Sequence, residues 1–180
     1  MSIKKHTDKR INPLFVHYRM NAGFIPLDTW VHDHGGRIIG EGCHLIDLMS
    51  SLTGSRISTI SYEKLSPNND KFSQQDNVAM ILKYEDGSVC TIHYFASGSK
   101  QVSKEYMEVH YDEKTIVMDD YKILKGYGVS LKEIILSRSE KGQKEELEAL
   151  YETLKGNKKE WPIALEDMIQ TTEATFLINK

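Results

Sequence analysis

The sequence predicts an α+β fold, in which an open, mainly antiparallel β-sheet carries helices packed on one of its faces. Residues 76–98 and 104–120 alternate apolar and polar side chains about tight turns, as β-hairpins do. Apolar side chains instead repeat at helical spacing in residues 42–53, and twice more near the C-terminus. Because the strands are grouped along the chain and do not alternate with helices, an α+β fold is favoured over a doubly wound one.

The part of the chain up to Gly54 is expected to form a strand, a loop and a helix. Residues 13–23 predict the strand, and residues 24–36, which contain proline and paired glycines, predict the loop. One face of the strand carries Val16, Tyr18 and Met20. The helix over 42–53 should end at Gly54. Its apolar stripe consists of Leu45, Leu48, Met49 and Leu52.

The rest of the chain is expected to supply most of the sheet and two further helices. Residues 56–65 predict a strand that precedes the two hairpins, and Asp86-Gly87 is expected to form the turn of the first hairpin. The remaining expected elements are short strands at 121–126 and 130–137 and helices near 142–155 and 164–178. The apolar faces of these helices consist of Leu147, Leu150, Tyr151 and Leu154, and of Leu165, Met168, Ile169, Thr172 and Phe176.

Composition and charge restrict the class of protein. The chain has 180 residues, a net charge of −3 and 39% hydrophobic residues, which fits an N-terminal arm at 1–12 and one domain at 13–180. No basic patch stands out and no apolar run could span a bilayer, so no nucleic-acid or membrane partner is expected. Cys43 and Cys90 are too few for a disulfide framework. Because the N-terminus also lacks an apolar leader, we expect a cytoplasmic protein.

The glycine-rich segment GGRIIGEG, residues 35–42, could bind a phosphate or a metal. It lacks the ending of a phosphate loop, and its glycines are wrongly spaced for a Rossmann turn. A metal would have to use His32, His34, Cys43 and His44. Zinc ligands usually come in separated pairs, whereas Cys43 and His44 are neighbours that point in different directions on a helix. We therefore expect no metal, and no cofactor bound by this chain alone.

A third interpretation of this segment is proton transfer by Glu41 and His44. Residues three apart share a face in the first turn of a helix, and histidine exchanges protons near neutral pH. The helix N-terminus favours a neutral imidazole and an anionic carboxylate. The residues alone leave a second alternative open, in which Glu41 caps the first turn and His44 packs half-buried.

The stretch NAGFIPLDTW, continued by GGRIIGEGCHLIDLMSSLTGS, resembles the C-terminal domain of the Gfo/Idh/MocA oxidoreductases, the group of glucose–fructose oxidoreductase, inositol dehydrogenase and the rhizopine-catabolism enzymes. It is most similar to the branch found in bacterial polysaccharide gene clusters. The closing segment KGQKEELEALYETLKGNKKEWPIALEDMIQTTEATFLINK is similar to the last helices of the family. The resemblance implies that residues 13–180 bind substrate and pair subunits through the sheet.

The resemblance also assigns roles to individual residues. The family motif is a glycine-rich turn followed by Asp-x-x-x-His, with the histidine near the reacting carbon of a sugar or polyol, and His44 matches that histidine. Gly40 stands at the position of the aspartate, which is a departure, and Glu41 is the candidate substitute. Asp47 matches an acidic residue that is common after the histidine, although a charge on the helix surface explains it more simply.

The resemblance implies NAD or NADP for a full-length member, but the glycine fingerprint and the Lys-Pro motif of the cofactor domain do not occur in these residues. Met1 lies just where the first strand of the substrate domain should start. We therefore expect a truncated, split or separately expressed half that does not turn over without a Rossmann domain. The alternative, from another class, is a non-catalytic binding or assembly module that has lost the chemistry.

Substrate contacts are expected from the first strand and the loop after it. Tryptophan rings stack on sugar faces, and arginine binds carboxylates or phosphates through two hydrogen bonds. The alternatives are a core anchor for the tryptophan and a solvated sheet residue for the arginine. The candidate substrate-binding residues are Arg19, Asn21, Trp30, His32 and Arg37. The expected partners are a sugar-like ligand, a second copy of the chain paired through the hairpin sheet, and a separate Rossmann domain.

Overall fold

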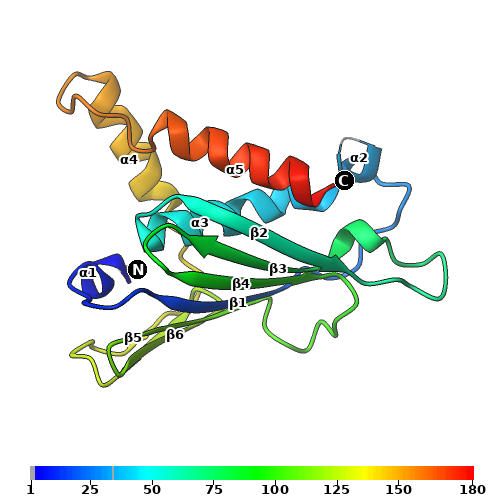
Figure 1. The fold of residues 1–180 in the computed structure, drawn as a ribbon, viewed down its shortest axis with the longest axis horizontal. Helices are drawn as coiled ribbons and strands as arrows, with labels where there is room; N and C mark the ends of the chain where they lie inside the picture. Colours follow the sequence, from blue (N-terminus) through cyan, green and yellow to red (C-terminus); the bar gives the residue numbers. More distant parts are fainter. Residues whose placement is uncertain (1–2, 34) are drawn as a thin grey trace.

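An eight-stranded sheet is the framework of the chain (Figure 1). The computed structural model describes residues 3–33 and 35–180. The strands are β1 (Phe15–Asn21), β2 (Ile57–Lys64), β3 (Asn77–Tyr84), β4 (Val89–Phe95), β5 (Glu105–Tyr111), β6 (Lys114–Asp119), β7 (Ile123–Tyr127) and β8 (Ile134–Ile135). Their order in the sheet is β2-β3-β4-β1-β5-β6-β7-β8.

Strand β1 lies inside the sheet and joins two antiparallel meanders. It pairs in parallel with β4, where His17 faces Thr91, and antiparallel with β5, where His17 faces Glu108. The other neighbouring strands are antiparallel. The parallel pair arises because the chain leaves β1, forms helical segments and the strands β2 and β3, and then returns as β4 beside β1. The predicted open, mainly antiparallel α+β sheet is thus confirmed.

One face of the sheet forms the core. Because side chains alternate along a strand, Val16, Tyr18 and Met20 of β1 are buried on this face. Helices α3 (Cys43–Thr53) and α5 (Leu165–Ile178) cover it, as Figure 1 shows. Each fully buried large apolar side chain contributes about 1.5–3 kcal/mol. The predicted stripe of α3 supplies its share of the core through Leu45, Met49 and Leu52.

Two glycines, Gly87 and Gly54, lie in the turns that the sequence predicted at the ends of β3 and α3. Gly87 has a φ of 90° in the hairpin between β3 and β4, and Gly54 has a φ of 66° after α3. The Gly54 N–H donates to the Ser50 carbonyl over 2.9 Å, which closes the helix. Residues with side chains are strained in this left-handed conformation, so glycine is the appropriate residue at both positions.

The glycine-rich segment is helical and not a simple turn. Residues Ile38–Gly42 form the π-helical turn η1, which runs directly into α3. A Cβ at Gly42 would lie 3.4 Å from the Ile38 side chain, at about van der Waals contact, so Gly42 packs closely on Ile38 within this turn. The loop expected at 24–36 also contains a short helix, α2 (Trp30–Asp33). Because a π-turn does not keep 3.6 residues per turn, it changes where the side chains around it point.

Of the two C-terminal helices, α5 lies over the core face of the sheet, and the larger apolar side chains of both helices point outward. Helix α4 (Gln143–Leu154) buries none of its residues, and Leu147 and Leu154 are 67% and 69% exposed. In α5 the buried residues are Thr171, Ala174, Thr175 and Ile178. Small side chains let α5 lie close to α3, which leaves the larger side chains of α5 exposed, among them Leu165, Met168, Ile169 and Phe176.

The described part of the expected N-terminal arm packs onto the domain through the short helix α1 (Lys4–Thr7). Ile3 and Thr7 are buried. Arg10 donates to the Thr53 carbonyl over 2.6 Å and to Asp86 over 2.9 Å, which ties the arm to two separate turns. Among the described residues, no helix has both the length and the hydropathy that crossing a membrane would require.

Candidate functional site

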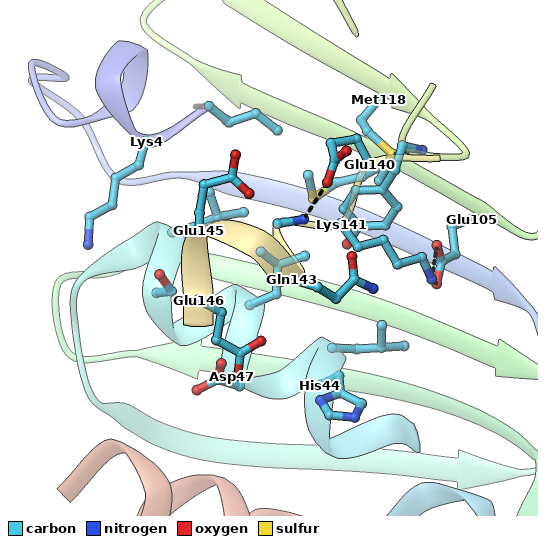
Figure 2. A pocket seen from close by; sticks show the side chains of 18 of the residues that line it. Lys4, His44, Asp47, Glu105, Met118, Glu140, Lys141, Gln143, Glu145 and Glu146 are labelled. Carbon is cyan, nitrogen blue, oxygen red and sulfur yellow. Dashed lines mark hydrogen bonds and ion pairs between the residues drawn. The ribbon is translucent and has the colours of Figure 1, made fainter. Parts of the chain in front are cut away.

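A cavity of about 970 Å³ lies between α3, the core face of the sheet, α1 and the segment that leads into α4 (Figure 2). This volume is within the range of pockets that bind small molecules. The sheet provides an apolar floor, which consists of Met20, Met107 and Met118. Ionisable side chains surround this floor. They include Glu41, His44, Asp47, Glu105, Lys141 and Glu146.

Glu41, in the π-turn, is held by donors from three separate parts of the chain. Tyr94 donates its O–H to Oε2 over 2.6 Å, and Lys104 Nζ donates to Oε1 over 2.7 Å. Arg37 Nη2 donates to Oε2 over 3.1 Å. Partial burial alone raises the pKa of this carboxyl, but the hydrogen bonds from Lys104 and Tyr94 outweigh it, and the net pKa lies below its ordinary value. A fixed anion of this kind is better suited to positioning other groups than to exchanging protons.

His44 lies in the first turn of α3 and borders the cavity (Figure 2). It is exposed, and it follows Glu41 by three residues, as expected. The hydrogen bonds of the Glu41 carboxylate nevertheless come from Tyr94, Arg37 and Lys104, not from the imidazole. His44 interacts electrostatically with Asp47 on the same helix. The imidazole is therefore accessible to a ligand in the cavity.

Glu105 and Lys141 form an ion pair at the opposite wall (Figure 2). Glu105, the first residue of β5, is only 3% exposed, and its carboxylate oxygens lie 2.9 Å from Lys141 Nζ. The same ammonium lies 5.3 Å from the centre of the Tyr121 ring. Ser139 donates to the Asp120 carbonyl over 2.6 Å, which fastens the segment before α4 to the sheet. The buried Glu105 charge is thus compensated by a residue distant in sequence.

Carboxylates gather where α3, α4 and α5 meet. Asp47 and Glu146 lie side by side in Figure 2, and Asp167 adds a third charge nearby. Partial burial and these two like charges raise the pKa of Asp47, while His44 acts in the opposite direction. This end of the cavity is therefore negative, and it favours groups that donate hydrogen bonds over phosphates.

The structure does not bring Arg19 and Asn21 to the cavity. Both alternate with Met20, so their side chains leave the opposite face of β1. Arg19 Nη1 donates to the Ser103 carbonyl over 2.8 Å, and Asn21 Nδ2 donates to the Ser99 carbonyl over 2.7 Å. These bonds hold the connection between β4 and β5 against the end of β1.

The other three predicted contacts, Trp30, His32 and Arg37, lie outside the residues that line the cavity. Trp30 is 69% exposed on α2. His32 Nε2 lies 3.7 Å from the buried Asp76, which belongs to the 3₁₀ turn η2 (Gln74–Asp76) before β3.

Arg37 is 3% exposed, and its guanidinium donates to the carbonyl of Gly23 over 2.6 Å and to that of Ala22 over 3.1 Å. Arg37 therefore does not line the cavity itself. It affects the cavity by holding the carboxylate of Glu41. Direct ligand contact by the five candidate residues of the first strand and loop stays a prediction.

Two other kinds of site can be tested against this geometry. Within residues 3–33 and 35–180, no three His, Cys, Asp or Glu side chains are grouped closely enough to hold a metal ion, and His34 lies outside the described residues. The glycine-rich segment follows the helix α2, and the helix after it leads into β2, which pairs antiparallel with β3. A dinucleotide-binding turn instead connects a strand to a helix within a βαβ unit. The glycine-rich segment therefore does not have the geometry of a dinucleotide-binding turn.

Comparison with known protein families identifies the fold. Residues 12–176 match the model of the Gfo/Idh/MocA group, described as an oxidoreductase family, C-terminal alpha/beta domain. The chain belongs to this Gfo/Idh/MocA oxidoreductase family. Among curated protein sequences, no match was found.

Solved structures share the fold of this Gfo/Idh/MocA domain at low identity. UDP-N-acetylglucosamine 3-dehydrogenase from Acidithiobacillus ferrooxidans is 15% identical with a TM-score of 0.69, over 93% of this chain and 52% of that one. An oxidoreductase domain protein from Kribbella flavida is 16% identical with a TM-score of 0.71, over 98% and 61%. An oxidoreductase from Thermotoga maritima is 22% identical with a TM-score of 0.61, over 93% and 50%. The chain thus spans about half to three-fifths of the length of these proteins.

Several residues of this Gfo/Idh/MocA site could not be found from local sequence patterns. Tyr94, Lys104, Glu105 and Lys141 come from separate elements that meet only when β5 pairs with β1 and the segment before α4 crosses the sheet. The one available signal was the pair Lys104-Glu105, two opposite charges at the start of a predicted strand.

Proposed function

We propose that this chain is the substrate-binding and subunit-pairing half of an NAD(P)-dependent oxidoreductase that acts on a sugar, a polyol or a nucleotide sugar. The cavity beside His44, in a domain of an oxidoreductase family, carries the proposal. Its ionisable walls suit the hydroxyl groups of such a ligand, and its methionine floor suits the C–H faces. The family match favours this function over a non-catalytic assembly module.

In this function His44 is the residue that accepts a proton. Alcohol oxidation releases the hydroxyl proton, and an accessible imidazole beside the cavity is suited to take it. Glu41 is engaged with three donors, so it keeps the π-turn and its neighbours in place. The glycine-rich segment does not have the geometry of a dinucleotide-binding turn, so in this proposal another domain supplies the acceptor of the hydride.

The exposed apolar side chains of the C-terminal helices support the proposal that the domain that supplies the hydride acceptor docks there. Leu147, Tyr151 and Leu154 of α4 are more than half exposed, as are Leu165 and Phe176 of α5. A contiguous apolar surface of this kind usually marks an interface. Since α4 also borders the cavity, a cofactor domain that covers α4 would lie next to the substrate. The matched structures are long enough to contain such a domain in addition to this one.

The open face of the sheet is proposed to pair two copies of the chain. Phe15, Ile81 and Tyr127 are at least half exposed on the strands, and His93 is exposed beside them. Antiparallel sheets can leave one face to solvent, but exposed aromatic and aliphatic side chains on that face favour association. Sedimentation should show a dimer or higher oligomer at micromolar concentration, and a monomer at high concentration would contradict the pairing.

Amide NMR spectra of the chain, recorded during titration with glucose, myo-inositol and UDP-N-acetylglucosamine, test the substrate half of the proposal. One of these probes should shift the signals of His44 and Arg37 together, because Arg37 supports the turn that carries His44. Shifts confined to the hairpins at 76–120 would contradict this placement.

A parallel fluorescence titration with NADH tests whether this chain binds the cofactor by itself. We expect no saturable binding at tens of micromolar protein, because the glycine-rich segment does not have the geometry of a dinucleotide-binding turn. Saturable binding would replace this proposal with a self-sufficient enzyme. Where a cognate Rossmann domain restores turnover in trans, His44→Gln should abolish it.

A further inference from the structure

We propose that Lys104 contacts the substrate and that Glu41 positions it, an inference that rests on the function proposed above. The Lys104 ammonium lies 2.7 Å from Glu41, a residue that lines the cavity. Its side chain is 43% exposed, so its remaining donors are open to a ligand. Lys104 was not among the residues that the sequence pointed to, because its position depends on the pairing of β5 with β1.

The position of the ammonium is set by a chain of bonds that leads back to the core. Tyr94, fully buried on β4, holds one oxygen of Glu41 at 2.6 Å. Arg37 holds the same oxygen and is itself fixed to the Ala22 and Gly23 carbonyls. The other oxygen of Glu41 is thereby directed at Lys104. An exposed lysine gains little from an isolated ion pair, but here its partner is immobilised before the pair forms.

The backbone of Lys104 is fixed as well. Its carbonyl accepts a hydrogen bond from the Asn21 N–H over 2.7 Å, at the point where β1 ends and β5 begins. The next residue, Glu105, lies in the cavity wall with its carboxylate neutralised by Lys141. Lys104 itself is not among the residues that line the cavity, but its stem starts next to the lining residue Glu105 and its ammonium ends beside the lining residue Glu41.

The chemistry of the group indicates what it recognises. An ammonium has three donors and no acceptor, and Glu41 takes one of them. The others suit an oxygen of the ligand, either a hydroxyl or a carboxylate. A sugar in the cavity would contact His44, which lines it together with Glu41, and the Lys104 ammonium that Glu41 holds. Lys104 would orient the sugar while His44 accepts the proton.

Binding of the probe that shifts His44 tests the inference, measured calorimetrically for the wild-type chain and for Lys104→Ala, Lys104→Arg and Glu41→Gln. Lys104→Ala should weaken binding about tenfold or more, because a hydrogen bond from a charged donor is lost. Lys104→Arg should recover part of the affinity. Glu41→Gln should weaken binding less than Lys104→Ala and should have no further effect in the Lys104→Ala background, whereas a role of Glu41 that is independent of Lys104 would weaken binding in both backgrounds.

Lys125→Ala is the matched control. Lys125 is 46% exposed and pairs over 3.0 Å with Glu133, which, unlike Glu41, does not line the cavity. Its removal should leave the affinity unchanged. Comparing glucose with glucuronate tells whether Lys104 reads a hydroxyl or a carboxylate. Wild-type binding that survives Lys104→Ala would overturn this inference alone, whereas a wild-type chain that binds none of the probes would overturn the proposed function together with it.

Discussion

Replacing Tyr94 with phenylalanine removes one hydroxyl from the network around Glu41 and leaves the rest of the side chain in place. That hydroxyl donates to Glu41 over 2.6 Å, the shortest of the three bonds that the carboxylate accepts. The ring lies on the core face of β4, 5.4 Å from the Arg37 guanidinium, and phenylalanine keeps both contacts. The substitution therefore isolates a hydrogen bond to a charged group.

The expected loss in the free energy of unfolding is about 2 kcal/mol at pH 7, since hydrogen bonds to charged groups contribute about 1.5–3 kcal/mol. For a domain of this size the corresponding fall in Tm is about 4–8 °C. The pKa of Glu41 in the folded state lies below its unfolded value, so its contribution is present at neutral pH and is lost as the pH falls through the folded pKa. Without Tyr94 the folded pKa rises toward the unfolded one. The difference between variant and wild type should therefore shrink below about pH 4.

Urea unfolding followed by circular dichroism at pH 7 and at pH 3.5 measures both effects. Tyr106→Phe is the control, because Tyr106 also donates to a carboxylate, that of Glu108 over 2.9 Å, but on the open face of the sheet. Solvent competes there, so its loss should cost under about 1 kcal/mol. Equal losses for the two variants, or a Tyr94→Phe effect that does not depend on pH, would refute the argument that Glu41 is held as an anion by its buried donor.

Two further predictions concern single residues. Gly54→Ala should destabilise the chain by about 1 kcal/mol in urea unfolding because the φ of 66° is left-handed, although nothing lies within 4 Å to obstruct a methyl group. Gly40→Ala, at a position without a left-handed φ, is the control, and an equal loss there would contradict the backbone explanation. Ellman's reagent at pH 8 should titrate one thiol in the native chain and the second only after unfolding, because burial raises the pKa of Cys90 to about 12 and leaves it inaccessible, whereas Cys43 is half-exposed. Two thiols that react equally fast in the native chain would contradict the burial of Cys90.

The strands and α3 could be predicted because their packing follows from local periodicity. Val16, Tyr18 and Met20 alternate on β1 and are buried, and Leu45, Met49 and Leu52 recur at helical spacing on α3 and are buried as well. The same rule failed for burial on α5, where Thr171, Ala174 and Thr175 face inward. An amphipathic pattern tells that an apolar face will be covered, but it does not tell whether the same chain covers it.

The candidate site could be predicted only in part, for a different reason. Glu41 and His44 were found because they lie only three residues apart, on either side of the junction between η1 and α3, where spacing is informative. The partners of Glu41 were missed because Tyr94 and Lys104 lie 53 and 63 residues away. The expected pairing of Glu41 with His44 assumed an ordinary helical turn, whereas the π-turn and three competing donors direct the carboxylate elsewhere.

The central place of β1 has a consequence for how the chain folds. The segments β2–β4 and β5–β8 can each form from near neighbours in sequence, but β1 pairs with strands that begin at Val89 and Glu105. During synthesis β1 emerges before both groups and must wait for β4 before its first ladder can form and for β5 before its second. Closing so long a loop slows folding, since its entropy is lost before the contacts are gained. Joining β1 to the two preformed groups is therefore the expected late step, and until it occurs the walls of the cavity belong to separate folding units.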